Sequence, residues 1–280
     1  GIYKPYRAMT DKGERLVGGM EAVSHYLNQI RAVEKNVFVV ETGDILTGTL
    51  AADIEYKGVV GGVMVEFLNR LGYSVFGYGN HDFDRGTRTT LGLAELARFP
   101  TIMANIVHKK NGKLFAPEPY HVFDVGKVKV AVIAVMEEIF LVEVQKSLII
   151  GLDVLPVVPT LKSYVPELDK KSDLIVVIVH SSFMDGVRVA REVAGIDVVL
   201  VAAEDGKFEV VDGVLVQSTI GHHRTVGYLK VDVVKDRVVS HEEKLIWLLA
   251  DGDLKPSPEV TALVKEVDTS IGDEYKKVIG

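Results

Sequence analysis

Residues 74–84, SVFGYGNHDFD, join a short apolar run to a dense cluster of polar side chains. A short run of apolar residues without polar interruption predicts a strand that is buried on both faces. Directly behind this run stand an amide, an imidazole and two carboxylates, in Asn80, His81, Asp82 and Asp84. Because open α/β sheets bind ligands at the carboxyl ends of their strands, this stretch is either a polar turn or part of an active site.

Five further apolar runs have strand length. They are VFVV (37–40), TIMANIV (101–107), KVKVAVIAVM (127–136), LIVVIV (174–179) and DVVLV (197–201). Two segments with apolar residues at three- and four-residue steps are expected to be helices. Their apolar residues are Met20, Val23, Leu27 and Ile30 in the first, and Val60, Met64, Phe67, Leu68 and Leu71 in the second. Strands that alternate with helices predict an α/β layered fold.

The pattern changes from about residue 207. KFEVVDGVLVQS and RTVGYLKVDVVKDRVVSHEEKLIWL alternate apolar and polar residues around the turn signals DG and KD, which predicts antiparallel hairpins. The chain then ends in an amphipathic helix, with Ser257 as its cap and Pro258 at the first helical position. We therefore expect two stacked sheets with helices outside, rather than one doubly wound sheet.

The composition excludes several classes of function. The chain has 280 residues, of which 48% are hydrophobic, and can bury a sizeable core. Its net charge of -7 leaves no basic stripe for a polyanionic backbone, so we expect no nucleic acid polymer as a partner. The absence of cysteine means that any metal must use His, Asp, Glu or Asn. All apolar runs are strand-sized, so we expect no membrane span.

Three polar side chains share one kind of position, the carboxyl end of a predicted buried strand. Asp44 follows VFVVETG, Asn80 follows SVFGYG, and His180 follows LIVVIV. An aspartate, an asparagine and a histidine from separate strands form a suitable ligand set for a divalent transition metal. Each residue alone also has a structural explanation, as a turn residue or a buried histidine. Their shared placement favours the metal site.

His81 and Asp84 are a candidate acid pair, because a carboxylate that orients an imidazole stabilises its protonated form. The segment GHHR at 221–224 stays open between two interpretations. A hairpin turn is favoured, but adjacent imidazoles near a polar crevice could also contact a ligand or metal. No GxSxG, GxxxxGK[ST] or strand-linked GxGxxG motif occurs, which argues against serine hydrolases, P-loop enzymes and dinucleotide binders.

ETGDILTGT, followed 36 positions after Asp44 by GNHDFD, resembles the calcineurin-like metallophosphoesterases, in particular their 5'-nucleotidase and UDP-sugar hydrolase branch. VVIVHSS, GIDVVLV and the terminal PEV…VIG helix follow in the same order, so the resemblance covers about residues 15–280. It implies a four-layer α/β/β/α sandwich of two mixed sheets flanked by helices. It also implies a catalytic domain at residues 1–250 and, at 251–280, a linker helix toward a C-terminal domain beyond this chain.

The resemblance further implies divalent metal ions, of Mn, Zn, Fe or Mg. In such a centre Asp44 bridges two ions, Asn80 and His180 bind the second ion, and His81 acts with Asp84 on the departing oxygen. A metal-bound hydroxide attacks phosphorus in line, which dephosphorylates nucleotides or related small phosphomonoesters. Relatives of this branch are mostly exported, so the resemblance implies a periplasmic or extracellular protein.

Two family elements differ in this sequence. The family's Asp-x-His, which ligates the first metal, is expected directly ahead of the glycine that corresponds to Gly1. After GIDVV the family has Gly-Gly-His-x-His or a variant ending in Gln, whereas this chain has LVAAEDGK. Ala203 thus replaces a ligand of the second metal, and Asp205 replaces one of the first. We expect three protein ligands for the second metal and weak binding of the first, so that fewer than two ions are held tightly.

These observations support two hypotheses. The first is a metal-dependent phosphoester hydrolase, because the candidate residues follow in the family's order. The alternative is a degenerate protein of the same fold with an incomplete metal site, which acts as a binding or interaction module. The AAED segment at 202–205, which stands where a metal-binding loop is expected, motivates this alternative.

Overall fold

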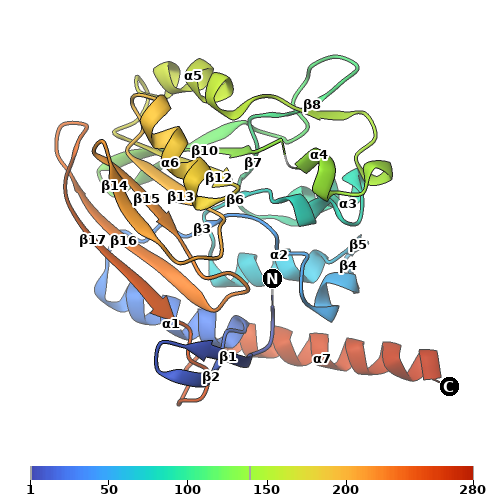
Figure 1. The fold of residues 1–280 in the computed structure, drawn as a ribbon. Coiled ribbons are helices and arrows are strands. Elements are labelled where there is room, and N and C mark those ends of the chain that lie inside the picture. Colours follow the sequence, from blue (N-terminus) through green and yellow to red (C-terminus); the bar gives the residue numbers. More distant parts are fainter. Residues whose placement is uncertain (1, 139, 280) are drawn as a thin grey trace.

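The computed structural model describes residues 2–138 and 140–279 as one layered α/β fold (Figure 1). Helices α5 (Val157–Leu168) and α6 (Phe183–Glu192) cover one face of a central sheet. A second layer of strands packs against the other face, and α1 (Met20–Val33) and α2 (Gly62–Leu71) lie beyond it. This arrangement confirms the predicted four-layer α/β/β/α sandwich.

The central sheet has six strands in the order β14-β15-β13-β12-β10-β9. Its four inner strands are parallel, and the two edge strands pair antiparallel with their neighbours. The sheet is therefore mixed, as expected. The strands are β9 (Tyr120–Val125), β10 (Val128–Met136), β12 (Leu174–His180), β13 (Val198–Val201), β14 (Phe208–Val211) and β15 (Val214–Ser218). Continuous apolar runs form the inner strands because helices bury one face and the second layer buries the other.

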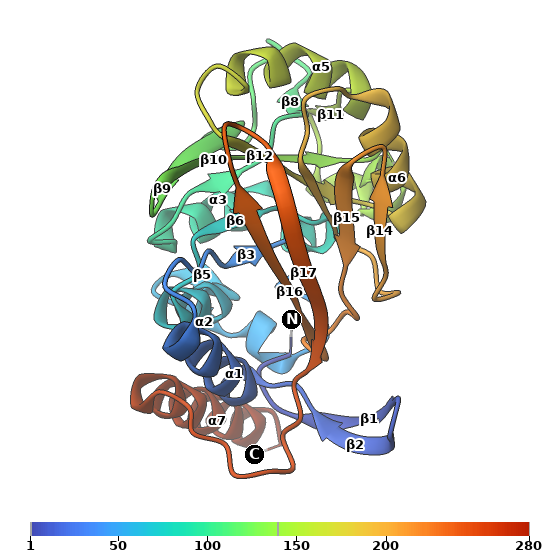
Figure 2. The same cartoon turned by 90° about the vertical axis from the view of Figure 1, so that its left-hand side faces the viewer.

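The second layer consists of two pieces in the described part of the chain. One is the parallel sheet β3-β6-β7, and the other is the antiparallel hairpin of β16 and β17 (Figure 2). Lys235 and Asp236 form the hairpin turn with positive φ angles, as two-residue hairpin turns require. These strands are β3 (Val40–Glu41), β6 (Val75–Gly77), β7 (Thr101–Ile102), β16 (Thr225–Val233) and β17 (Val238–Trp247).

Two expected strands differ from their predicted extent. VFVV at 37–40 contributes only its last residue to β3. TIMANIV at 101–107 is divided between β7 and β8 (Ile106–His108). The side chain of Asn105 causes this break, because it donates to the carbonyls of Met136 and Leu155 at 2.7 and 2.8 Å and accepts from the N–H of Met136. The predicted helix around 60–71 begins at Gly62, and Val60 belongs to β5 (Val59–Val60).

The terminal helix α7 (Pro258–Ile279) begins where its cap signal predicted. Its buried residues Val260, Leu263, Val264 and Val267 pack in the same core as α1 and α2. No helix in the described part of the chain is long and apolar enough to cross a membrane. The smaller elements are β1 (Tyr6–Thr10), β2 (Gly13–Val17), β4 (Glu55–Tyr56), β5 (Val59–Val60), α3 (Thr87–Leu96), α4 (Phe140–Glu143) and β11 (Leu152–Val154).

The two strand layers approach each other closely at β6. A Cβ atom added to Gly77 would lie 3.0 Å from the Cβ of Ala134 on β10 and 3.1 Å from the side chain of Ile178 on β12. A glycine at this position therefore allows β6 to lie directly against the central sheet. As a result, the carboxyl ends of β3, β6 and β12 meet at one edge of the sandwich.

Candidate metal centre

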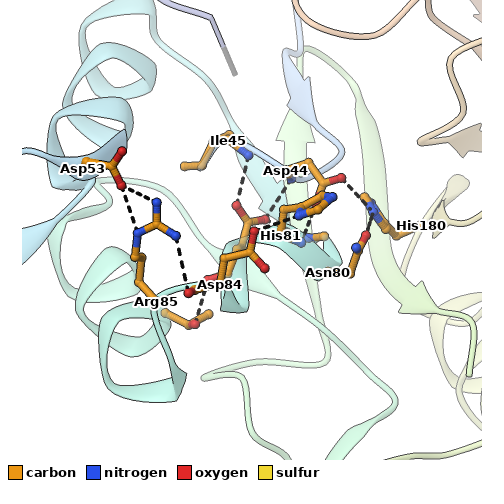
Figure 3. Close-up of polar contacts among 11 residues, drawn as sticks. Asp44, Ile45, Asp53, Asn80, His81, Asp84, Arg85 and His180 are labelled. Atoms are coloured by element: carbon orange, nitrogen blue, oxygen red, sulfur yellow. Dashed lines mark hydrogen bonds and ion pairs between the residues drawn. The ribbon is translucent and has the colours of Figure 1, made fainter. Parts of the chain in front are cut away.

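Asp44, Asn80 and His180 meet at this shared edge (Figure 3). His180 ends β12, Asp44 lies three residues after β3, and Asn80 lies three residues after β6. The Nε2 of His180 is 3.0 Å from Asn80 Oδ1 and 3.4 Å from Asp44 Oδ2. The structure thus brings together the three side chains that the sequence placed at successive strand ends.

The spacing of these three side chains suits one divalent cation. Atoms that bind the same ion at about 2.0–2.2 Å lie roughly 3 to 3.5 Å apart when they subtend right or tetrahedral angles. The His180 ring is also oriented as a ligand should be, because its Nδ1 donates to the carbonyl of Thr42 at 3.0 Å and leaves Nε2 facing the other two. The donor set therefore fits a metal with three protein ligands.

The backbone around this centre is tightly constrained. Asp44 has a φ angle of 65°, a left-handed conformation that is uncommon for residues other than glycine and is concentrated at functional sites. A Cβ atom on Gly79 would overlap the carboxylate of Asp44 and the ring of His180. Only glycine can therefore precede Asn80 while both candidate ligands keep their places.

The protonation of Asp44 and His180 is linked. Burial would raise the pKa of Asp44, but its hydrogen bond with His180, that residue's charge and the N–H of His81 hold this pKa below its usual value. Burial would lower the pKa of His180, but the hydrogen bond and charge of Asp44 raise it. A cation at this place would replace the positive charge of the imidazolium. Metal binding therefore competes with protonation of His180 and weakens as the pH falls.

His81 and Asp84 form the expected pair. Nδ1 of His81 lies 2.8 Å from Asp84 Oδ2, and the imidazole remains partly exposed, at 43% of its side chain. Burial acts against the charged ring, but its hydrogen bond to Asp84 and the charges of Asp44 and Asp84 raise the pKa of His81. The backbone N–H of His81 also donates to Asp44 Oδ1 at 2.9 Å. These contacts thus favour the charged form of the His81 imidazole beside the candidate metal ligands.

Asp82 is a residue of this centre to which the sequence assigned no chemistry. Its side chain is fully buried, and Oδ2 accepts hydrogen bonds from the N–H groups of Asp44 and Gly79, while Oδ1 accepts from Ile45. Burial, and then the charge of Asp44, raise the pKa of Asp82 to about 7, against the effect of these N–H donors. The sequence offered one sign of this burial. Asp82 directly precedes the apolar residue Phe83, which is also fully buried.

The carboxylate of Asp205 is held by two neighbouring side chains. Its Oδ2 is 2.8 Å from the ammonium of Lys207, and its Oδ1 accepts from the hydroxyl of Ser218 at 2.7 Å. Asp44, His81 and His180 line a cavity that Ala203 and Glu204 also line, whereas neither Asn80 nor Asp205 is among its lining residues. Among residues 2–138 and 140–279, no three His, Asp or Glu side chains gather closely enough to hold a metal ion, so the candidate site depends on Asn80.

The GHHR segment forms a turn and also contributes imidazoles to the same cavity. His222 and His223 have φ angles of 60° and 53°, in the turn before β16. Nε2 of His222 is 3.1 Å from Glu204 Oε1, and Nε2 of His223 is 3.8 Å from Glu41 Oε2. Both rings line the cavity that Asp44 lines. The backbone therefore agrees with the turn interpretation, and both histidines also lie at the cavity.

Comparison with known proteins by sequence finds 5'-nucleotidases. No family model matches the chain. The 5'-nucleotidase of Vibrio cholerae is 33% identical over 174 residues, which are 58% of this chain and 30% of that protein. The chain spans only 19% to 35% of the length of the curated relatives that it matches.

Solved structures share the fold. A 5'-nucleotidase precursor from Thermus thermophilus superposes with a TM-score of 0.84 at 20% identity, over 97% of this chain and 57% of that one. The calcineurin-like phosphoesterase YfkN from Bacillus subtilis gives a TM-score of 0.78 at 17% identity, over 90% and 89% of the two chains. The layered sandwich is therefore the fold of these phosphoesterases.

Proposed function

Since this chain belongs to the 5'-nucleotidase family of calcineurin-like metallophosphoesterases, we propose that it is the catalytic domain of a metal-dependent phosphomonoesterase. One observation carries this proposal. The three candidate ligands Asp44, Asn80 and His180 converge at 3.0–3.4 Å, and the His81–Asp84 pair stands directly beside them. A polar turn at a strand end would need no such convergence from three separate strands.

Each residue has a distinct role in the proposed reaction. Asp44, Asn80 and His180 would hold a divalent cation, which supplies a Lewis acid for phosphoryl oxygens and lowers the pKa of water. His81 would donate a proton to the departing ester oxygen, because the raised pKa of its imidazole favours the protonated form. Asp84 is a positioning residue that fixes the ring and supports its charge.

A second cation would need changes around Asp205. We propose that Asp205 becomes a ligand only when its carboxylate leaves Lys207 and Ser218, which now hold it. This makes single occupancy the expected state of the 280 residues. The oxygen and nitrogen donors suit Mn, Zn, Fe or Mg, and manganese is a convenient probe for all experiments on this site.

The proposed substrate class, second domain and location of the protein are based on its relatives. The names of the Vibrio cholerae and Haemophilus influenzae relatives support nucleotides, or similar small phosphomonoesters, as substrates. Because relatives are longer, we propose that residues 251–280 lead toward a second domain that helps to hold the nucleoside. Export to the periplasm or cell exterior is part of the same proposal, and a polymeric nucleic acid is not an expected substrate.

The decisive experiment compares two histidines in similar pairs. Phosphate release from p-nitrophenyl phosphate with added manganese should be abolished by His81→Ala. His121→Ala is the matched control, because His121 contacts Glu118 at 2.7 Å with the same three-residue spacing but lies on β9. Equal residual activity in the two variants would contradict the proposal. Absence of manganese binding in calorimetry would instead favour the noncatalytic alternative.

A further inference from the structure

Thr90 is a buried polar residue of α3 (Thr87–Leu96) that has no part in the proposed reaction so far. Thr90 and Leu93 are the buried residues of this helix, and both are 0% exposed. Residues three positions apart lie on the same face of a helix, so Thr90 occupies the packed face of α3, where an apolar side chain would fit. Burying a hydroxyl costs free energy unless the hydroxyl is hydrogen-bonded. The partners of this hydroxyl therefore indicate what Thr90 does.

The hydroxyl of Thr90 contacts two backbone carbonyls. Its Oγ1 donates to the carbonyl oxygen of Asp82 at 2.8 Å, and the carbonyl oxygen of Gly86 lies 3.2 Å away. The contact with Gly86, four residues earlier, is one that threonines in helices commonly make. A hydroxyl has one hydrogen to donate, and the shorter distance favours Asp82 as its acceptor. Thr90 thus joins α3 to a segment outside the helix.

The carbonyl of Asp82 lies in the middle of the turn that carries the candidate acid pair (Figure 3). This turn begins with the 3₁₀ helix η2 (Asn80–Phe83). His81 precedes the peptide that joins Asp82 to Phe83, and Asp84 follows it. The distance of 2.8 Å between His81 Nδ1 and Asp84 Oδ2 therefore spans this peptide. Rotation of the peptide would change the geometry of the pair.

The end of the same turn has a weaker anchor. Nε of Arg85 lies 3.1 Å from Asp53 Oδ1, but the side chain of Asp53 is 54% exposed. Solvent screens such an exposed ion pair, which therefore restrains the backbone little. The hydrogen bond from Thr90 is buried and acts on the middle of the turn, so it is better placed to fix the orientation of the peptide.

We propose that Thr90 is a positioning residue for the His81–Asp84 pair, which it aligns by holding the carbonyl of Asp82. The hydroxyl of Thr90, rather than the volume of its side chain, is the group that this role requires. The inference rests on the proposed function, because alignment of the pair affects catalysis only if His81 is the acid.

The test replaces the hydroxyl in two matched helices. Thr90→Val removes the hydroxyl and keeps the volume, whereas Thr90→Ser keeps the hydroxyl. Thr160→Val is the control, because Thr160 on α5 is also buried, at 7% exposure, and its Oγ1 donates to the carbonyl of Pro156, four residues earlier, at 2.8 Å. Both valine variants lose a hydroxyl that contacts the carbonyl four residues back. The difference between them therefore isolates the contact of Thr90 with Asp82.

Phosphate release from p-nitrophenyl phosphate with added manganese is the first measurement. Thr90→Val should lower kcat about tenfold or more, because small misplacements of a reacting group cost this much. KM should change little, since the pair acts in the transition state. Thr90→Ser and Thr160→Val should keep kcat close to that of the parent chain. Equal kcat in the two valine variants, a change confined to KM, or no recovery in Thr90→Ser would overturn the inference.

Native-state hydrogen exchange distinguishes failure of this inference from failure of the proposed function. The N–H of Asp84 donates to the carbonyl of His81 at 3.2 Å and reports the order of the turn without substrate. Relative to the N–H groups of β10, its exchange should become about tenfold faster in Thr90→Val, and should stay unchanged in Thr90→Ser and Thr160→Val. If the parent chain releases no phosphate, the proposed function fails, and unchanged exchange of Asp84 in Thr90→Val then overturns the positioning role. If Thr90→Val does not fold, Thr90→Ala takes its place.

Discussion

The carboxylate of Asp82 accepts a hydrogen bond from the backbone N–H of Asp44, with 2.9 Å between Oδ2 and N. The same oxygen accepts from the N–H of Gly79 at 2.8 Å. Asp44 lies in the loop after β3, whereas Gly79 precedes the candidate ligand Asn80 in the loop after β6. One buried carboxylate therefore holds together the two loops that carry candidate ligands.

We expect Asp82→Asn to weaken both the fold and the metal site. An amide cannot accept all three N–H groups, and each unsatisfied buried donor costs about 1–3 kcal/mol. The free energy of unfolding, measured in urea, should fall by about 3 kcal/mol, and manganese affinity, measured by calorimetry, should fall at least tenfold. Asp11→Asn, at an exposed turn, is the control. Unchanged manganese affinity in Asp82→Asn would show that the loops are positioned by other contacts.

Asp84→Asn should shift the pH dependence of activity. The charge and hydrogen bond of Asp84 help to raise the pKa of His81, so their loss lowers this pKa. Because the protonated ring is the proposed acid, activity is lost as pH rises through the pKa. The alkaline limb of the kcat profile should therefore move to lower pH, and kcat at neutral pH should fall roughly tenfold or more. Glu118→Gln, which alters the pair with His121, should leave the profile unchanged. An unshifted alkaline limb would exclude His81 as the acid.

Glu66 on α2 should stabilise the fold only above acidic pH. Its side chain is 7% exposed, and it accepts from Arg70 at 3.0 Å. Burial would raise the pKa of Glu66, but Arg70, Asn69 and nearby charges lower it from its ordinary value of 4.5. The ionised form therefore contributes stability above about pH 4.5, and this contribution is lost as the pH falls through the lower folded-state pKa.

Glu66→Gln should consequently lower the free energy of unfolding by about 2 kcal/mol at pH 7, since it leaves Arg70 without its charge partner. The difference from the parent chain should shrink below pH 4.5. Glu167→Gln removes an exposed pair of the same spacing with Lys171, and should have little effect at any pH. Urea unfolding at pH 7 and pH 4 measures both variants. If the loss of unfolding free energy in Glu66→Gln grows toward low pH, the lowered pKa of Glu66 is contradicted.

Much of the fold could be predicted because short stretches of sequence determine its strands and helix ends. Uninterrupted apolar runs marked β10, β12 and β13 of the central sheet, and the cap at Ser257 marked the start of α7. The division of TIMANIV could not be predicted, because Asn105 breaks the strand through contacts with the distant Met136 and Leu155. The short β3 has a similar origin, since a strand extends only where its edges have partners.

The candidate site was predictable where several functional residues stand at strand ends. Asp44, Asn80 and His180 are directed by their strands, so their convergence follows from the sheet. Asp82 was missed because its role depends on burial and on backbone donors from another loop. The position of Asp205 depends on its local contacts with Lys207 and Ser218, which no periodicity reveals.

Ala203 offers the sharpest test of where the cation lies. It lines the same cavity as Asp44 and His180, at a position where the sequence resemblance implies a histidine ligand, and its methyl group supplies no donor. Ala203→His should add a fourth ligand and raise manganese affinity at least tenfold in calorimetry. Ala203→Leu fills similar space without a donor atom and should not raise it. If both variants fold but neither binds manganese more tightly than the parent chain, the cation does not lie between Asp44, His180 and the AAED segment, and the proposed ligand set must be revised.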